Sequence, residues 1–167
     1  MSAIHFGSIF LKELETEAIA TRKCLERMPI DKLFNWKPHE KSMVFGYLAL
    51  LVAEMPNWIA YMIRDKEIDL ATFPHLQAKT TAELVAGFDE YMEAARQALE
   101  PLPNEALQEV FILKSNGQEL FRSPLFDSIS STINHWVHHR GQMTVYMRLN
   151  DILVPSIYGP SADERTY

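Results

Sequence analysis

The stretch LFDSISSTINHWVHHRGQMTVYMRL, residues 125–149, decides the fold. Its apolar residues return every three or four positions, which is the period of an α-helix with one buried face. The buried stripe consists of Ile129, Ile133, Trp136, Met143 and Met147. A helix with such a stripe must cover it with other elements, so further helices are expected around it.

Three other segments repeat this periodicity and predict helices over residues 6–28, 42–63 and 80–99. Pro29 follows the first helix directly and is expected to stop it, because a proline ring cannot continue a helix. Together with residues 125–149 these segments predict an all-α fold. The simplest architecture is a four-helix bundle that forms one domain over residues 1–167.

Local signals refine the ends of these helices. Ser42 is a candidate N-cap for the second helix. Thr80 followed by Glu83 fits a capping box at the start of the third helix. Pro56 lies inside the second helix and is expected to bend it or to remove one of its hydrogen bonds.

Two connections between the helices are long. Residues 64–79 are expected to cross the end of the bundle. Residues 109–123 hold two short strand-like runs around Asn116-Gly117. Because Asn-Gly readily adopts the positive φ angles of a tight turn, we expect a small β-hairpin between the third and fourth helices.

Composition and charge exclude several classes of protein. The chain has 167 residues, of which 47% are hydrophobic, and a net charge of −6 without a long basic run. A nucleic-acid partner is therefore not expected, since binding to phosphates normally needs a basic face. No apolar run is long enough to span a bilayer and no signal-peptide pattern begins the chain, so we expect a cytoplasmic protein without a membrane partner. The single cysteine, Cys24, lies in a helix and is expected to be a buried, unreactive thiol.

His135 and His139 are the candidate metal ligands. They lie four residues apart, so both project from one face of the same helix and could chelate one divalent ion. Position 136 is Trp, so the HExxH arrangement of metalloproteases is absent. A hydrogen-bonded histidine cluster without metal is the alternative. Glu54 interrupts an apolar helix, for which solvent exposure is the simpler explanation.

The run NHWVHHRGQMTVYMRLND, residues 134–151, and the following VPSIYGPSADE, residues 154–164, resemble the signature of the DinB-like proteins. NWKPHEKSM at residues 35–43 and ATFP at residues 71–74 also match the layout of that family. The resemblance covers essentially the whole chain. The family takes its name from a damage-inducible gene and is unrelated to the DNA polymerase that shares the name.

This resemblance implies a bundle of up-down-down-up connectivity that commonly forms a homodimer. It also implies a nickel or zinc site that takes one histidine from the second helix and two from the fourth. The last two carry over onto His135 and His139. Characterised relatives include enzymes that use low-molecular-weight thiols, so a small-molecule thiol is an expected partner.

The sequence departs from the family pattern in the second helix. Where the family has a histidine ligand, the stretch LALLVAE at residues 48–54 places Leu51, which cannot bind a metal. Glu54, one turn further on, is a candidate third ligand. Two functions therefore stay open. One is a divalent-metal-dependent, thiol-transferase-like enzyme, in which Arg140, Gln142 or Tyr146 would orient the substrate; the other is a metal-free, non-catalytic bundle that binds a small molecule or another protein.

Overall fold

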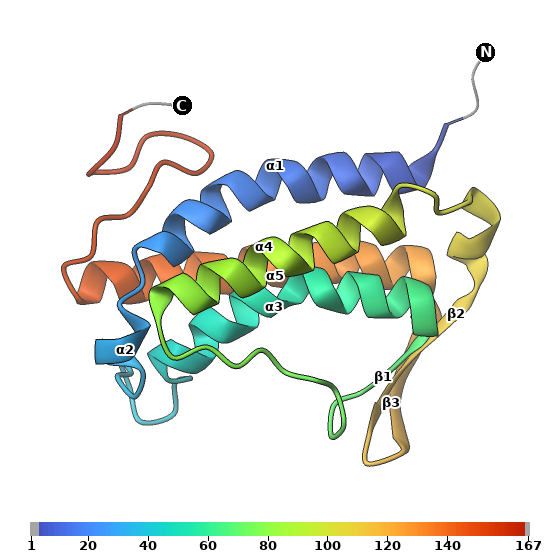
Figure 1. The fold of residues 1–167 in the computed structure, drawn as a ribbon, viewed down its shortest axis with the longest axis horizontal. Coiled ribbons are helices and arrows are strands. Elements are labelled where there is room, and N and C mark those ends of the chain that lie inside the picture. Colours follow the sequence, from blue (N-terminus) through green and yellow to red (C-terminus); the bar gives the residue numbers. More distant parts are fainter. Residues whose placement is uncertain (1–3, 166–167) are drawn as a thin grey trace.

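The computed structural model describes residues 4–165 and shows the predicted helical bundle with a small sheet at one end (Figure 1). The four long helices are α1 (Phe6–Glu26), α3 (Phe45–Asp65), α4 (Thr81–Leu99) and α5 (Leu125–Leu149). The short elements are α2 (Ile30–Leu33), the 3-10 helix η1 (Asn104–Gln108), and the strands β1 (Glu67–Asp69), β2 (Val110–Ser115) and β3 (Gln118–Pro124). Within this described range no helix is both long and apolar enough to cross a membrane.

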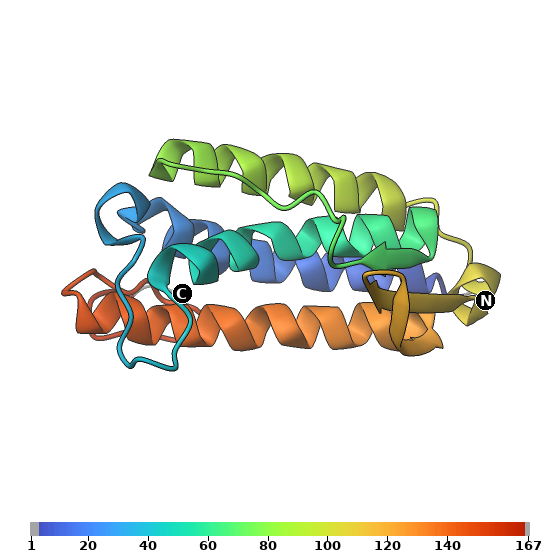
Figure 2. The same ribbon diagram turned by 90° about the horizontal axis from the view of Figure 1, so that it is seen from below.

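The helices follow the up-down-down-up order. Figures 1 and 2 show α3 and α4 running in the same direction, with α1 and α5 running in the opposite one. Two consecutive parallel helices need a connection as long as the helices themselves. Residues 66–80 therefore return along the length of the bundle beside α3 and α4, and the expectation that they cross its end was wrong.

Of the two N-caps predicted from the sequence, one is confirmed and the other is wrong. Thr80 caps α4 as expected: its side chain accepts a hydrogen bond from the Glu83 amide, and the Glu83 carboxylate accepts one from the Thr80 amide. Ser42 does not cap α3, which begins three residues later at Phe45. The carbonyl oxygens of Trp36 and Phe34 accept hydrogen bonds from the first amides of that helix at 2.7 and 2.9 Å. The chain after α2 thus supplies the cap that we had assigned to a serine.

Pro56 lies within α3 without ending it. A proline has no N–H group, so the carbonyl oxygen four residues earlier, on Val52, loses its partner in the helix. Trp136 of α5 replaces that partner, because its indole Nε1 donates to the Val52 oxygen at 2.8 Å. The missing hydrogen bond, which the sequence predicts, becomes a fixed contact between two helices.

The predicted hairpin is present, and it carries a strand that the sequence did not predict. β2 and β3 pair antiparallel through a turn in which Asn116 and Gly117 have φ angles of 51° and 76°. β1 adds to β2 in parallel. The Asp69 carboxylate at the end of β1 accepts hydrogen bonds from the amides of Asn116 and Gly117, at 3.0 and 2.6 Å. The connection after α3 is therefore fastened to the hairpin turn.

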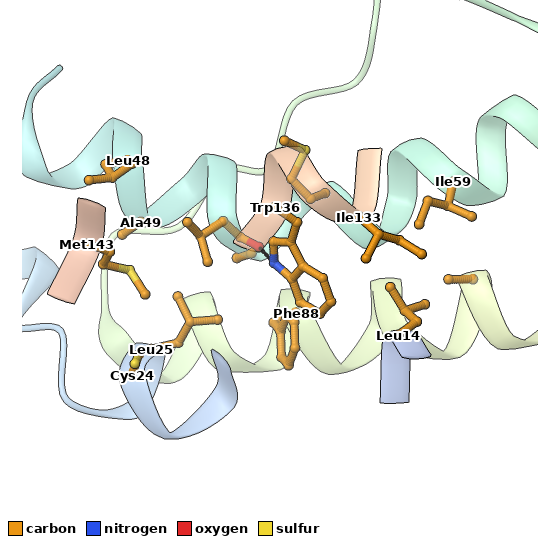
Figure 3. Close-up of a cluster of buried hydrophobic side chains, with 14 of the residues drawn as sticks. Leu14, Cys24, Leu25, Leu48, Ala49, Ile59, Phe88, Ile133, Trp136 and Met143 are labelled. Carbon is orange, nitrogen blue, oxygen red and sulfur yellow. Dashed lines mark hydrogen bonds between the residues drawn. The ribbon is translucent and has the colours of Figure 1, made fainter. Parts of the chain in front are cut away.

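The core fills the space between the four long helices. Trp136 lies near its centre and is almost fully buried, with its ring centroid 6.2 Å from that of Phe88 of α4 (Figure 3). Leucines, isoleucines and methionines of all four helices surround this pair. Trp136 is thus both a packing residue and the donor that completes α3.

We predict that replacing Trp136 destabilises the protein, and that the size of this loss depends on whether position 56 is a proline. Trp136→Phe leaves the buried Val52 carbonyl without a donor and should lower the free energy of unfolding by about 1–3 kcal/mol, in addition to the cost of lost packing. Pro56→Ala restores a backbone N–H, so it should recover part of this loss in the Trp136→Phe background. Urea unfolding of the four proteins in this double-mutant cycle measures the effect. If Pro56→Ala changed the free energy of unfolding equally in both backgrounds, the Trp136 indole would not be the replacement donor for the Val52 carbonyl.

Candidate functional site along helix α3

His135 and His139 are close together on α5, as their spacing predicts. Their Nε2 atoms lie 2.7 Å apart, so one ring donates a hydrogen bond to the other. Gln142 fixes the second ring, because its Oε1 lies 2.8 Å from Nδ1 of His139. Burial, together with the imidazoles of His139 and His138, lowers the pKa of His135. A lowered pKa keeps this imidazole neutral and able to bind a metal.

Glu54 is buried, which corrects the expectation that solvent exposure explains it. Its side chain is only 3% exposed, and three N–H groups donate to it. The donors are Nε1 of Trp58 at 2.8 Å, Nδ1 of His75 at 2.9 Å and the backbone amide of Leu76 at 2.7 Å. The last two belong to the connection between α3 and α4, so a carboxylate of α3 holds that connection against the bundle.

A cavity of about 770 Å³ opens between α3 and this connection. Its apolar wall consists of Phe34, Tyr47, Leu50, Leu51, Leu76 and Ala78, and its polar lining consists of Glu54, His75, Gln77, Lys79 and Glu83. The cavity is within the range of roughly 300–1,000 Å³ that is usual for small-molecule sites. Leu51, the residue at the position of the expected metal ligand, is part of the apolar wall.

The residues present fit two positions of a three-histidine metal site. Three contacts set α5 beside α3 and the segment just before it: Met62 with Thr132, Val52 with Trp136, and Met43, two residues before α3, with Tyr146. This antiparallel register places Leu51 roughly level with His139 along the helix axes. In the site that the resemblance implies, the third histidine would come from this level of α3, where a leucine offers no donor atom.

Glu54 is not gathered with the two histidines. All three of its hydrogen bonds go to Trp58 and the connection. Trp58 lies next to His135, with ring centroids 6.3 Å apart. Among residues 4–165 no three His, Cys, Asp or Glu side chains are grouped so that they could hold a metal ion. A metal site that includes Glu54 stays a prediction that would need this carboxylate to leave its present partners.

Two residues that the sequence offered for substrate orientation instead hold the fold together. The guanidinium of Arg140 is 2% exposed and pairs with Glu17 at 2.6 Å, while Tyr158 of the C-terminal segment accepts a further hydrogen bond from it at 2.8 Å. The hydroxyl of Tyr146 donates to the Met43 carbonyl at 3.0 Å. Gln142 alone of the three lies beside the candidate ligands, through His139.

Comparison with known proteins identifies the family of the chain. The family model described as "DinB family" matches residues 1–166. The chain belongs to the DinB family. A curated relative is "Uncharacterized protein YrdA" of Bacillus subtilis, 30% identical over 160 residues that cover 93% of this chain and 89% of the relative.

Two solved DinB-like structures share the fold. The protein YjoA of Bacillus subtilis has a TM-score of 0.66 at 20% identity, and the match covers 93% of this chain and 99% of that one. A protein of Bacillus cereus has a TM-score of 0.67 at 23% identity, with 89% and 95% of the two chains covered. At this level of identity the likeness shows the DinB fold and carries no activity to this chain.

Sequence reasoning missed His75 and Trp58 in this DinB bundle. His75 lies in an irregular connection, where neither periodicity nor motif spacing indicates what it contacts. Trp58 follows Glu54 by four residues, and that helical spacing is the signal that could have paired them. Of the residues that donate a hydrogen bond to Glu54, Leu76 is the most distant in sequence, and only the fold brings it close.

Cys24 is expected to be inert toward thiol reagents. It is fully buried, and burial raises the pKa of its thiol from 9.0 to about 11. At about pH 8 this difference alone lowers the thiolate fraction about 100-fold relative to the unfolded chain, since only the thiolate is nucleophilic. Reaction with a disulfide reagent should therefore be at least that much slower in native protein than in urea, and it should speed up as the pH rises toward 11. A native rate close to the unfolded rate would show that Cys24 is accessible and activated.

Proposed function

We propose that this DinB-family protein binds a small organic molecule in the cavity between α3 and the connection of residues 66–80. The observation that carries the proposal is Leu51. By the resemblance to the family it takes the place of a histidine ligand, and it forms part of the apolar wall of a cavity of about 770 Å³. The same residue removes a metal donor and adds apolar surface that a ligand can cover.

The lining of the cavity suits a molecule with an aromatic body and one polar group. The rings of Phe34 and Tyr47 lie edge to face, with centroids 5.4 Å apart, and Tyr47 is 61% exposed. A bound aromatic ring would extend this stack and cover that exposed surface. Glu54 and His75 supply convergent polar atoms at the same cavity, as a site that orients its ligand requires.

A second candidate function is binding of a divalent metal ion by His135 and His139. It is favoured by the 2.7 Å approach of the two Nε2 atoms and by Gln142, which orients His139 as an outer-shell partner of a ligand does. Zinc or nickel suits two imidazoles, and water would complete the coordination. Such an ion, when bound, lowers the pKa of a coordinated thiol or water and so provides the chemistry of a thiol-transferase-like enzyme.

The first prediction concerns the cavity. Wild-type protein is expected to bind the neutral aromatic compound 4-nitroanisole, and Leu51→Trp is expected to weaken this binding about tenfold or more, because the indole fills the space. Equilibrium dialysis measures the affinity. Leu120→Trp on the exposed hairpin is the matched control and should bind like the wild type. Unchanged affinity of Leu51→Trp would place the bound compound elsewhere.

The second prediction concerns the metal. Leu51→His is expected to complete a three-histidine site and to raise zinc affinity at least about tenfold, the lower limit of what even an outer-shell partner contributes. Competition with a chelator, on protein without a histidine tag, measures this change. His135→Ala and His139→Ala should abolish the gain, whereas His138→Ala should keep it. No gain in Leu51→His would mean that position 51 does not face the pair.

A further inference from the structure

The pairing of Glu54 with His75 has the geometry of a base held by a buried carboxylate. Nδ1 of His75 lies 2.9 and 3.2 Å from the two oxygens of Glu54. The carboxylate is 3% exposed, whereas the imidazole is 49% exposed and lines the cavity. Catalytic histidines are oriented in this way, with one nitrogen on a carboxylate and the other on the reacting group.

The hydrogen bonds around Glu54 determine which nitrogen of His75 carries the hydrogen. One carboxylate oxygen accepts from Trp58 and the other from the Leu76 amide, so both oxygens already act as acceptors. An ionised carboxylate has no hydrogen to donate, so Nδ1 of His75 is the donor, and in the neutral ring Nε2 is then the acceptor. Nε2 has no hydrogen-bond partner among the residues that the structure describes. Nε2 is therefore the atom of the Glu54–His75 pair that can accept a hydrogen bond from a ligand.

The surroundings of His75 indicate what this nitrogen would accept. The cavity offers aromatic and aliphatic walls, and Lys79 adds an ammonium group. No carboxylate within the described residues forms an ion pair with Lys79. The two carboxylates of the lining are already engaged: Glu54 accepts hydrogen bonds from Trp58, His75 and Leu76, and Glu83 accepts from the backbone amides of Lys79 and Thr80. A ligand that develops negative charge on oxygen would therefore meet a cation that is not yet paired.

We propose that His75 acts as a general base, held by Glu54, toward aromatic compounds that carry a weakly acidic hydroxyl group. On binding, the O–H bond breaks, its proton moves to Nε2, and the electron pair stays on the oxygen as an oxyanion. The resulting imidazolium is stabilised by the Glu54 carboxylate and the oxyanion by Lys79. This inference rests on the proposed binding function of the cavity and adds the class of ligand. His75 would be the residue in contact with the ligand, and Glu54 a positioning residue.

A purely structural role is the competing explanation, since the same hydrogen bond also fastens the connection to α3. The two explanations differ in their effect on a bound phenol. If the hydrogen bond between His75 and Glu54 is only structural, its loss should change the affinities for ligands with and without an acidic hydrogen equally. A general base should distinguish them and change the ionised fraction of the phenol.

The experiment compares 4-nitrophenol with 4-nitroanisole, its methyl ether, which lacks the acidic hydrogen. Wild-type protein is expected to bind the phenol about tenfold more tightly than the ether. At a pH below the pKa of the free phenol, the visible absorption band of its oxyanion should grow on binding. His75→Gln should make the affinities for the phenol and the ether equal and should abolish the growth of the oxyanion band, while Glu54→Gln should reduce that band. His39→Gln, at another exposed histidine, is the control and should behave like the wild type.

Each outcome decides between the claims. Binding of the ether without any preference for the phenol in wild-type protein would overturn the general base and leave the binding cavity in place. A preference that persists in His75→Gln would assign the proton to another group and also overturn it. Failure of wild-type protein to bind either compound would overturn both the cavity and the base.

Discussion

The bundle depends on one hydrogen bond between helices, from the indole of Trp136 to the carbonyl of Val52. Pro56 makes this bond necessary, because α3 cannot satisfy that carbonyl itself. A buried carbonyl without a donor costs more than an ordinary hydrogen bond gains, so α5 cannot shift along α3 by even one turn without penalty. This constraint helps to fix the position along α3 of His135, whose ring lies beside Trp58.

A second buried polar group, the Glu54 carboxylate, determines the path of the connection to α4. Parallel neighbours force residues 66–80 to travel the length of the bundle, and an unstructured segment of that length loses considerable entropy when it is fixed. The hydrogen bonds from His75 and Leu76 to Glu54 offset part of that loss. They hold the segment at the distance from α3 that leaves the cavity. The cavity thus results from the hydrogen bonds that the connection donates to the buried Glu54 carboxylate.

The sequence predicts those parts of the structure that depend on local physics. Helical periodicity located α1, α4 and α5 to within two residues, and the Asn116-Gly117 turn and the Thr80 capping box formed as expected because each is satisfied within a few residues. The start of α3 was wrong because carbonyl groups of the preceding loop replace a side-chain cap. β1 was missed because a strand of three residues has too little pattern to detect. Glu54 was misjudged because its donors His75 and Leu76 lie more than 20 residues away in the sequence.

Leu51 and Trp58 link the two candidate sites of this chain. Both lie on the face of α3 that also carries Glu54, at spacings of three and four residues, so they form one row along the helix. At one end of the row, Leu51 forms part of the apolar wall of the cavity. At the other, Trp58 contacts His135 with its ring and Glu54 with its Nε1. A ligand that moves Glu54 must therefore also change the environment of Trp58, and an ion that moves His135 must do the same. The two candidate sites share one indole, and its emission reports on both.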